Sequence, residues 1–230
     1  MTTPIHIHPT AELAPRVLLP GDPGRALQLA QSLLEEPRMF NHNRGLWGYT
    51  GAAVADGVPL TIQSTGMGGP SAAIVVEELA DLGAERVVRV GTCGAIAGGL
   101  ELGDLVAVSH ALSADGASRA LGAADPVAAD AGLTAALHGD HRGIAVTTDL
   151  FYDPRAASNH AGWVAAGAIV IEMEAAAVLA VAQRRGLRAG CLLAVTDLLT
   201  GDARRRIDGD GYLSAGERLG RTAVAALVPE

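Results

Sequence analysis

Hydrophobic residues fall in short runs that are separated by segments with helical spacing, and this alternation continues along most of the chain. The short runs predict strands at 16–20, 47–54, 58–64, 86–90, 104–112, 143–147, 169–174 and 188–194. Apolar residues three and four apart predict helices at 26–34, 70–82, 129–137, 175–185 and 212–227. This order favours an α/β domain with a mixed, largely parallel sheet that has helices on both faces.

Polar or glycine-rich stretches follow several of these strands, at the sheet edge where such folds bind ligands. In the segment 86–94, a buried strand is predicted to end in a turn of small residues. Gly91 and Gly94 would let a ligand approach the backbone, and Arg89 inside the apolar run requires an anionic partner. The segment therefore indicates either an oxyanion site, with phosphate as the simplest occupant, or an ordinary turn with Arg89 paired to a carboxylate.

Acidic and aromatic residues mark further strand ends. Glu172 and Glu174 alternate in strand register, so they are predicted to point the same way, either as acceptors for sugar hydroxyls or as an acidic helix cap. Asp197 lies beside apolar residues and could serve as a general acid. Phe151 either stacks on a ring ligand or fills the core at a turn.

Composition excludes several kinds of chemistry. All 17 basic residues are arginine, so lysine-dependent Schiff bases and P-loops are ruled out. The net charge of −8 argues against a nucleic-acid or anionic-membrane surface. The two cysteines are far apart in the sequence, so we expect them to be small core residues rather than a disulfide or a metal set. His6 and His8 alone make a weak pair of metal ligands, so no metal is expected. With 230 residues, no evident linker and no leader or spanning segment, we expect one cytoplasmic domain over residues 1–230.

Six motifs occur in the order found in the nucleoside phosphorylase-I family, and together they cover nearly the whole chain. They are Pro20-Gly-Asp-Pro23 with Arg25, Asn43-Arg44-Gly45, Ser64 to Ser71, Arg89 to Ala95, Glu172-Met-Glu-Ala175 and Thr196-Asp197. The chain resembles the smaller-subunit branch, which holds bacterial hexameric purine nucleoside phosphorylases and uridine phosphorylases. The resemblance implies a single α/β domain whose central mixed sheet is partly closed and flanked by helices. It also implies phosphorolysis of nucleosides.

The resemblance assigns roles to particular residues. It implies that phosphate, a co-substrate and not a cofactor, is held by Gly21, Arg25, Arg44, Arg89, Gly91 and Thr92. It implies that the nucleoside is bound by His6, Cys93, Gly94, Phe151, Glu172, Met173, Glu174 and Thr196. Asp197 stands where the purine enzymes protonate N7, and an arginine assists it. Arg204, Arg205, Arg206 and Arg218 are candidates for that arginine, and Arg206 is the residue we predict.

Other functions stay open on the sequence. Uridine phosphorylases carry an extra segment with a Gln and an Arg that read uracil, whereas residues 155–168 contain no Gln, so purine is favoured. A nucleosidase would not need three phosphate-binding arginines. A nucleoside-binding protein without catalysis is the alternative from another class. The spacing of Gly66, Gly68 and Gly69 does not fit a dinucleotide fingerprint.

The resemblance also implies assembly. In the family, the residues that correspond to His6 and Arg44 reach the site of a neighbouring subunit. We therefore expect a homo-oligomer, in the family's form a hexamer built as three dimers, with a purine nucleoside and phosphate as ligands and with neither nucleic acid nor membrane as a partner.

Overall fold

A mixed sheet of eleven strands organises the chain, of which the computed structural model describes residues 4–201 and 203–228. The strands are β1 (Arg16–Leu19), β2 (Leu34–Asn41), β3 (Gly48–Ala53), β4 (Pro59–Gln63), β5 (Arg86–Ala95), β6 (Leu105–Ala114), β7 (Val127–Ala128), β8 (His141–Thr148), β9 (Ala168–Glu172), β10 (Arg188–Leu198) and β11 (Arg205–Arg206). The helices are α1 (Pro23–Leu33), α2 (Gly69–Asp81), α3 (Gly116–Ala120), α4 (Ala131–Ala136), α5 (Ala156–Ala165), α6 (Ala175–Arg185) and α7 (Gly209–Ala226), with a 3₁₀ turn at Asn43–Gly45.

Part of the sheet closes on itself. β10 pairs with β6, β6 with β8, β8 with β9, β9 with β5, and β5 again with β10. The expected partly closed mixed sheet is confirmed. Along one edge of β5, residues 86–89 pair with β1 and residues 94–95 pair with β9. The two neighbours part between these points, so the sheet opens beside the middle of β5.

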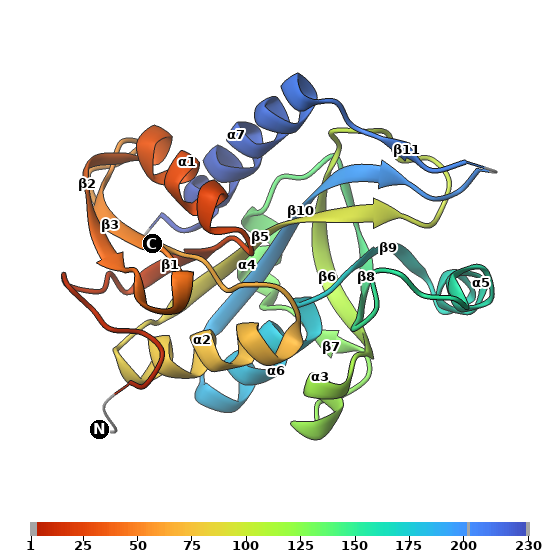
Figure 1. Cartoon of the computed structure of the whole chain (residues 1–230), viewed down its shortest axis with the longest axis horizontal. Coiled ribbons are helices and arrows are strands. Elements are labelled where there is room, and N and C mark those ends of the chain that lie inside the picture. Colours follow the sequence, from red (N-terminus) through yellow and green to blue (C-terminus); the bar gives the residue numbers. More distant parts are fainter. Residues whose placement is uncertain (1–3, 202, 229–230) are drawn as a thin grey trace.

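Helices cover both sides of the sheet, as the alternating pattern predicts. In Figure 1, α1 and α7 lie together on one side and α2 and α6 on the other, while α5 stands apart at the far end of β9. The core is built almost entirely of Val, Leu, Ile and Ala, because the chain has few aromatic residues to bury. None of the described helices is long and apolar enough to cross a membrane.

The turn expected after residue 90 is wrong. β5 instead continues to Ala95 and stays paired with β10, with Gly91 opposite Leu193 and Cys93 opposite Val195. The glycines are required for another reason. A side chain at Gly91 would meet the Arg89 guanidinium at 2.8 Å, and one at Gly94 would meet Leu199 at 2.7 Å. The residues are small because other side chains pack across the strand.

Several elements were not predicted. β2 is an edge strand with five consecutive exposed residues and a proline, so it has no apolar alternation. α5 lacks a side-chain cap and contains no buried residue. The Ala-, Gly- and Asp-rich segment 113–142, expected to be partly surface loop, contains α3 and β7, whereas α4 lies within the helix predicted at 129–137.

Candidate active site

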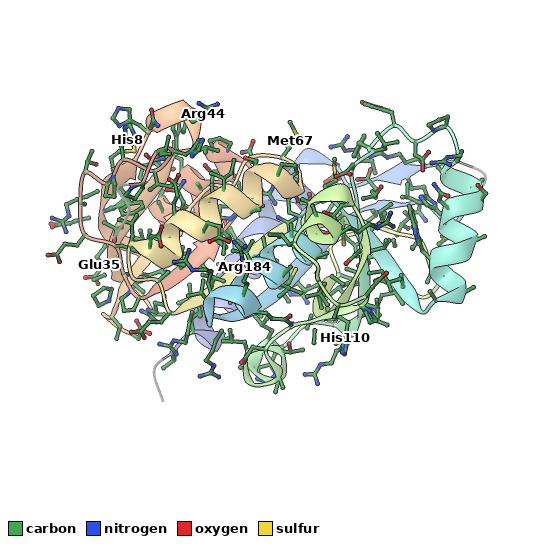
Figure 2. The ribbon with its side chains drawn as sticks, turned by 90° about the horizontal axis from the view of Figure 1, so that it is seen from below. His8, Glu35, Arg44, Met67, His110 and Arg184 are labelled. Carbon is green, nitrogen blue, oxygen red and sulfur yellow. The ribbon has the colours of Figure 1, made fainter. Side chains whose placement is uncertain are left out.

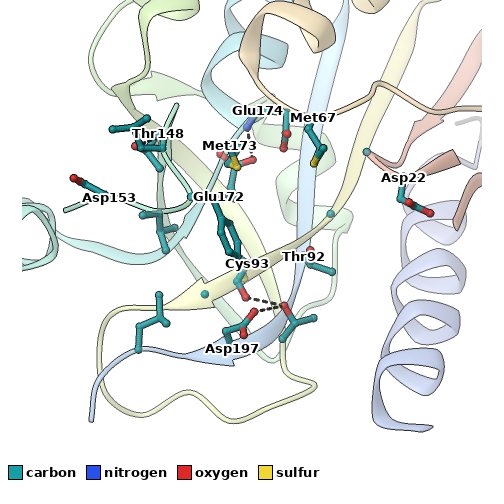
Figure 3. A pocket seen from close by; sticks show the side chains of 18 of the residues that line it. Asp22, Met67, Thr92, Cys93, Thr148, Asp153, Glu172, Met173, Glu174 and Asp197 are labelled. Carbon is teal, nitrogen blue, oxygen red and sulfur yellow. Dashed lines mark hydrogen bonds between the residues drawn. The ribbon is translucent and has the colours of Figure 1, made fainter. Parts of the chain in front are cut away.

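A cavity of about 540 Å³ opens beside the second half of β5, at the ends of β9 and β10. That volume is typical of sites for small organic ligands. Figure 3 shows it extending from Asp22 on one side to Asp153 on the other, with Met173 and Glu174 between them. Most predicted site residues line it, namely Gly21, Arg25, Arg89, Gly91, Thr92, Cys93, Gly94, Phe151, Glu172, Met173, Glu174, Thr196 and Asp197. Outside this lining lie His6, Arg44 and Arg206.

Arg89 is held by the two acidic residues of the β9–α6 junction. Its Nε donates to Glu172 Oε2 at 2.9 Å, and its Nη2 bonds Glu174 Oε2. Burial lowers the pKa of the Arg89 guanidinium, but the charges of Glu174 and Glu172 outweigh that effect and the net pKa is raised. Glu174 occupies the N-cap position of α6, beyond the end of β9, but its side chain does not cap the helix. The two carboxylates instead converge on one guanidinium.

Both carboxylate oxygens of Glu172 already accept hydrogen bonds from the protein. Oε2 also accepts from the backbone N–H groups of Glu174 and Ala175 at 2.8 Å, and Oε1 accepts from the Thr147 hydroxyl at 2.5 Å. Burial and the nearby Glu174 raise the pKa of this carboxyl, whereas Arg89 lowers it. Glu172 thus lines the cavity as the group that orients Arg89 and the start of α6.

Buried guanidinium N–H groups without a partner mark one end of the cavity. Among the described residues these are Nε and Nη1 of Arg25 and Nη1 of Arg89. Arg25 sits in the first turn of α1, where Asp22 caps the helix by accepting from its backbone N–H at 2.7 Å. Burial lowers the pKa of Arg25, and the positive charge of Arg89 adds to this. Two buried cations with unused donors, next to Gly91 and Thr92, form a site for an anion.

The other end of the cavity carries an acid and an aromatic ring. Asp197, near the end of β10, is almost fully buried and accepts from Thr196 at 3.0 Å and from Arg204 Nε at 2.7 Å. The guanidinium of Arg204 also lies over the Phe151 ring, 4.9 Å from its centroid. The hydrogen bond to Asp197 raises the pKa of Arg204. Arg206 lies at 3.9 Å from Asp197 and is largely exposed, and Arg218 bonds Asp140 instead.

Comparison with known proteins decides the family. Residues 15–228 match the family model described as the phosphorylase superfamily. The chain belongs to this superfamily. It is 37% identical over 205 residues to guanosine phosphorylase of Halorubrum lacusprofundi, covering 85% of this chain and 83% of that protein. It is 36% identical to the DeoD-type purine nucleoside phosphorylase of Geobacillus kaustophilus, covering 84% and 85%.

A solved structure of a uridine phosphorylase also resembles this member of the phosphorylase superfamily in fold. The structure of uridine phosphorylase from Vibrio fischeri ES114 superimposes with a TM-score of 0.83 at 28% sequence identity. The match covers 94% of this chain and 91% of that one. The relatives of this superfamily member thus carry names for purine, guanosine and uridine substrates, so the base is not decided by the family alone.

His6 and Arg44 lie close together, away from the lining of their own chain's cavity. Asn43 donates to the His6 carbonyl at 3.0 Å, and Figure 2 shows Arg44 near His8 at one end of the molecule. Arg44 is exposed and has a φ of +57°, in the left-handed region that costs a non-glycine residue roughly 1–2 kcal/mol. Arg44 thus combines a strained backbone with a side chain that is exposed in the single chain.

Some cavity residues of this phosphorylase superfamily member were missed by sequence reasoning. Tyr212, from the first turn of α7, lies beside Arg25 with the guanidinium 5.9 Å from its ring centroid. His160 and Trp163 of α5 line the opposite wall. The sequence signal for these two residues is their spacing of three, which places them on the same face of a helix. That signal could not be used, because α5 itself was not predicted. No group of three metal-ligating side chains is assembled within residues 4–201 and 203–228.

Cys93 also lines the cavity, but it is not a nucleophile. Burial raises the pKa of its thiol well above the usual value, so the thiol stays protonated. Its Sγ donates to the Ala194 carbonyl at 3.5 Å. Cys93 therefore supplies a small, weakly polar wall.

Proposed function

We propose that this protein cleaves purine ribonucleosides and deoxyribonucleosides by phosphorolysis, giving the free base and the pentose 1-phosphate. The observation that carries the proposal is the set of unpartnered, buried N–H groups of Arg25 and Arg89 at one end of a ligand-sized cavity. An anion there neutralises charge that is otherwise buried at a cost, and inorganic phosphate supplies both the anion and the nucleophile.

The sugar is assigned to the middle of the cavity. Glu174, which accepts from Arg89 and from the Gly68 N–H, is next to both the anion site and Met173. Its carboxylate suits the sugar hydroxyls, and Met173 suits the apolar face of the ring. As the C1′–N bond to the base lengthens, the sugar develops oxocarbenium character. The phosphate held by the two arginines stabilises that charge and forms the new C1′–O bond.

The base is assigned to the end with Asp197 and Phe151. The base leaves with the electron pair of the broken bond, so a proton donor assists its departure. Asp197 in its acid form gives that proton to purine N7. Arg204 then stabilises the carboxylate that remains, because it already bonds Asp197 in the unliganded site. Arg204, rather than Arg206, is the arginine that we assign to this role. Phe151 stacks on the base once Arg204 moves from its ring.

The assembly we propose is a homo-oligomer, as a trimer of dimers, in which His6 and Arg44 complete the site of a neighbour. Support comes from the position of both residues outside their own cavity and from the strained, exposed Arg44. His6 would bind the 5′ end of the sugar and Arg44 the phosphate.

Uridine is the second candidate substrate, because the superimposed structure is that of a uridine phosphorylase. A pyrimidine has no N7, so it offers no such acceptor for the proton of Asp197. The cavity wall at 155–168 also contains no Gln to read uracil. Both observations favour a purine.

The test is base release from inosine, guanosine, adenosine and uridine, each with and without phosphate. We expect phosphate-dependent cleavage of the purine nucleosides. Asp197→Asn should lower kcat for inosine by about 10²–10⁴-fold, while exposed Asp210→Asn should have no effect. Equal rates without phosphate would indicate a nucleosidase, uridine alone as substrate would refute the purine assignment, and binding without turnover would identify a binding protein.

A further inference from the structure

One wall of the cavity is built from a segment that packs loosely on the rest of the protein. It comprises residues 149–165, the loop after β8 together with α5, which stands away from the body in Figure 1. Leu150, Phe151 and Tyr152 are all more than half exposed, and α5 contains no buried residue. Only one face of α5, with Ala156, His160 and Trp163, lines the cavity.

Trp163 fixes this face of α5 in place. Its ring packs, with Ile171 and Leu199, against the small apolar cluster of Ile96, Val146 and Ala168. His160 lies one turn earlier on the same face, and the two rings are in contact with centroids 5.8 Å apart. The imidazole is thereby oriented by an indole that is itself anchored in the core.

His160 has an unused capacity to form hydrogen bonds. Neither ring nitrogen has a hydrogen-bond partner among residues 4–201 and 203–228, although the side chain is only partly exposed. Burial lowers the pKa of His160, and Asp153 only partly opposes this. The ring is therefore neutral at pH 7 and presents one N–H donor and one nitrogen acceptor.

The proposed function indicates a role for these groups. In that proposal, Arg25 and Arg89 bind the anion, Glu174 and Met173 adjoin the sugar, and Asp197 and Phe151 adjoin the base, and all six residues line the cavity together with His160. His160 is the titratable side chain of α5 that lines the cavity, and α5 directly follows the loop that holds Phe151. A base held against Asp197 by its five-membered ring extends its six-membered ring farther into this end of the cavity.

We propose that His160 reads the base, by hydrogen bonding to the polar edge of the six-membered ring of a purine. This inference rests on the proposed function. The other residues on the inner face of α5 are Ala156, which has no side-chain hydrogen-bonding group, and Trp163, which has one N–H donor, no acceptor and a ring packed against the apolar cluster. A site that forms such a bond discriminates against a base that lacks the partner group.

Purine riboside provides the test, because it has neither the 6-oxo group nor the N1–H of inosine. The measurement is the ratio of kcat/KM for inosine to kcat/KM for purine riboside, both at saturating phosphate. His160→Phe keeps an aromatic ring against Trp163 but removes both hydrogen-bonding groups. We expect this ratio to fall about tenfold, and to recover at least partly in His160→Gln, which restores a donor and an acceptor.

Ser158→Ala is the matched control. Ser158 lies on the solvent face of the same helix and bonds only the Arg155 carbonyl, so the ratio should stay at the wild-type value. A ratio that changes less than twofold in His160→Phe overturns the inference, even if both rates fall together. If the wild type cleaves neither purine nucleoside, the proposed function fails instead, and the two failures are thereby distinguished.

Discussion

At the scale of single residues, Arg25 is the clearest case of a side chain whose effects on stability and on function oppose each other. It is nearly buried, two of its nitrogens have no partner within the described residues, and its nearest charged neighbours include another arginine. Such a group destabilises the unliganded fold, because a buried donor loses its water without replacement. In the proposed function, the bound phosphate supplies the missing acceptor.

Arg25→Met should therefore separate the two effects. Without phosphate, the free energy of unfolding should rise by about 1–3 kcal/mol, since the unpaired charge is replaced by an apolar chain. The KM for phosphate should rise about a hundredfold, because two charge-assisted hydrogen bonds are lost. Unfolding without phosphate measures the stability, and initial rates at varied phosphate measure KM; phosphate should also raise the Tm of the wild type more than that of the variant.

Arg38→Met is the control for this experiment. Arg38 is exposed on the edge strand β2, so its replacement should leave both the stability and the phosphate response unchanged. A loss of stability in Arg25→Met without phosphate would contradict our interpretation that this arginine is unsatisfied at rest.

At the scale of elements, the sequence predicted those strands and helix ends that depend on residues close together in the chain. The valines of β5, the Pro70 start of α2 and the Gly186 end of α6 gave clear signals. β2 could not be predicted, because an exposed edge strand needs no apolar alternation and its pairing with β3 is long-range information. Similarly, Gly91 was taken for a turn residue because the close approach of the Arg89 side chain depends on a rotamer, not on the sequence.

The N-terminal segment 5–8 forms neither helix nor strand, and most of it is fixed by hydrogen bonds to a single carboxylate. Glu78 of α2 accepts from the backbone N–H groups of Ile5, His6 and Ile7, and from the His6 ring at 2.7 Å. Burial raises the pKa of Glu78, but the hydrogen bonds from His6 and these backbone groups outweigh it. The net pKa lies below the ordinary value of 4.5.

This depressed pKa gives a pH dependence with a definite sign. The stabilisation by Glu78 should be fully present above about pH 4.5 and be lost as the pH falls through the lower pKa of the folded state. The protection of the amides of residues 5–7, that is, their exchange rate relative to the intrinsic rate at the same pH, should fall in that acidic range. Glu78→Gln should show faster exchange at neutral pH and lose the acid transition, whereas exposed Glu85→Gln should behave like the wild type. An unchanged acid transition in Glu78→Gln would contradict this account.

At the scale of the whole molecule, closure of the sheet creates the site. β5 has β1 and then β9 along one edge and β10 along the other, so residues 90–93 face the gap where β1 and β9 part. No local pattern predicts this closure, which depends on a parallel register between strands about a hundred residues apart. The motif order indicated most of the lining, but the residues on α5 and the pairing of Arg204 with Asp197 required coordinates.

The last prediction concerns residues that the single chain leaves outside its own cavity. If Arg44 completes the phosphate site of a neighbour, Arg44→Ala should raise the KM for phosphate at least tenfold, because one charge-assisted contact is lost. Asp197→Asn disables the site in its own chain. Co-expression of the two variants should then restore activity. Half of randomly formed dimers are mixed, and in each mixed dimer one site receives both Asp197 and Arg44, so about a quarter of wild-type activity is expected. Activity equal to the mean of the two separate variants would show that Arg44 does not act across an interface.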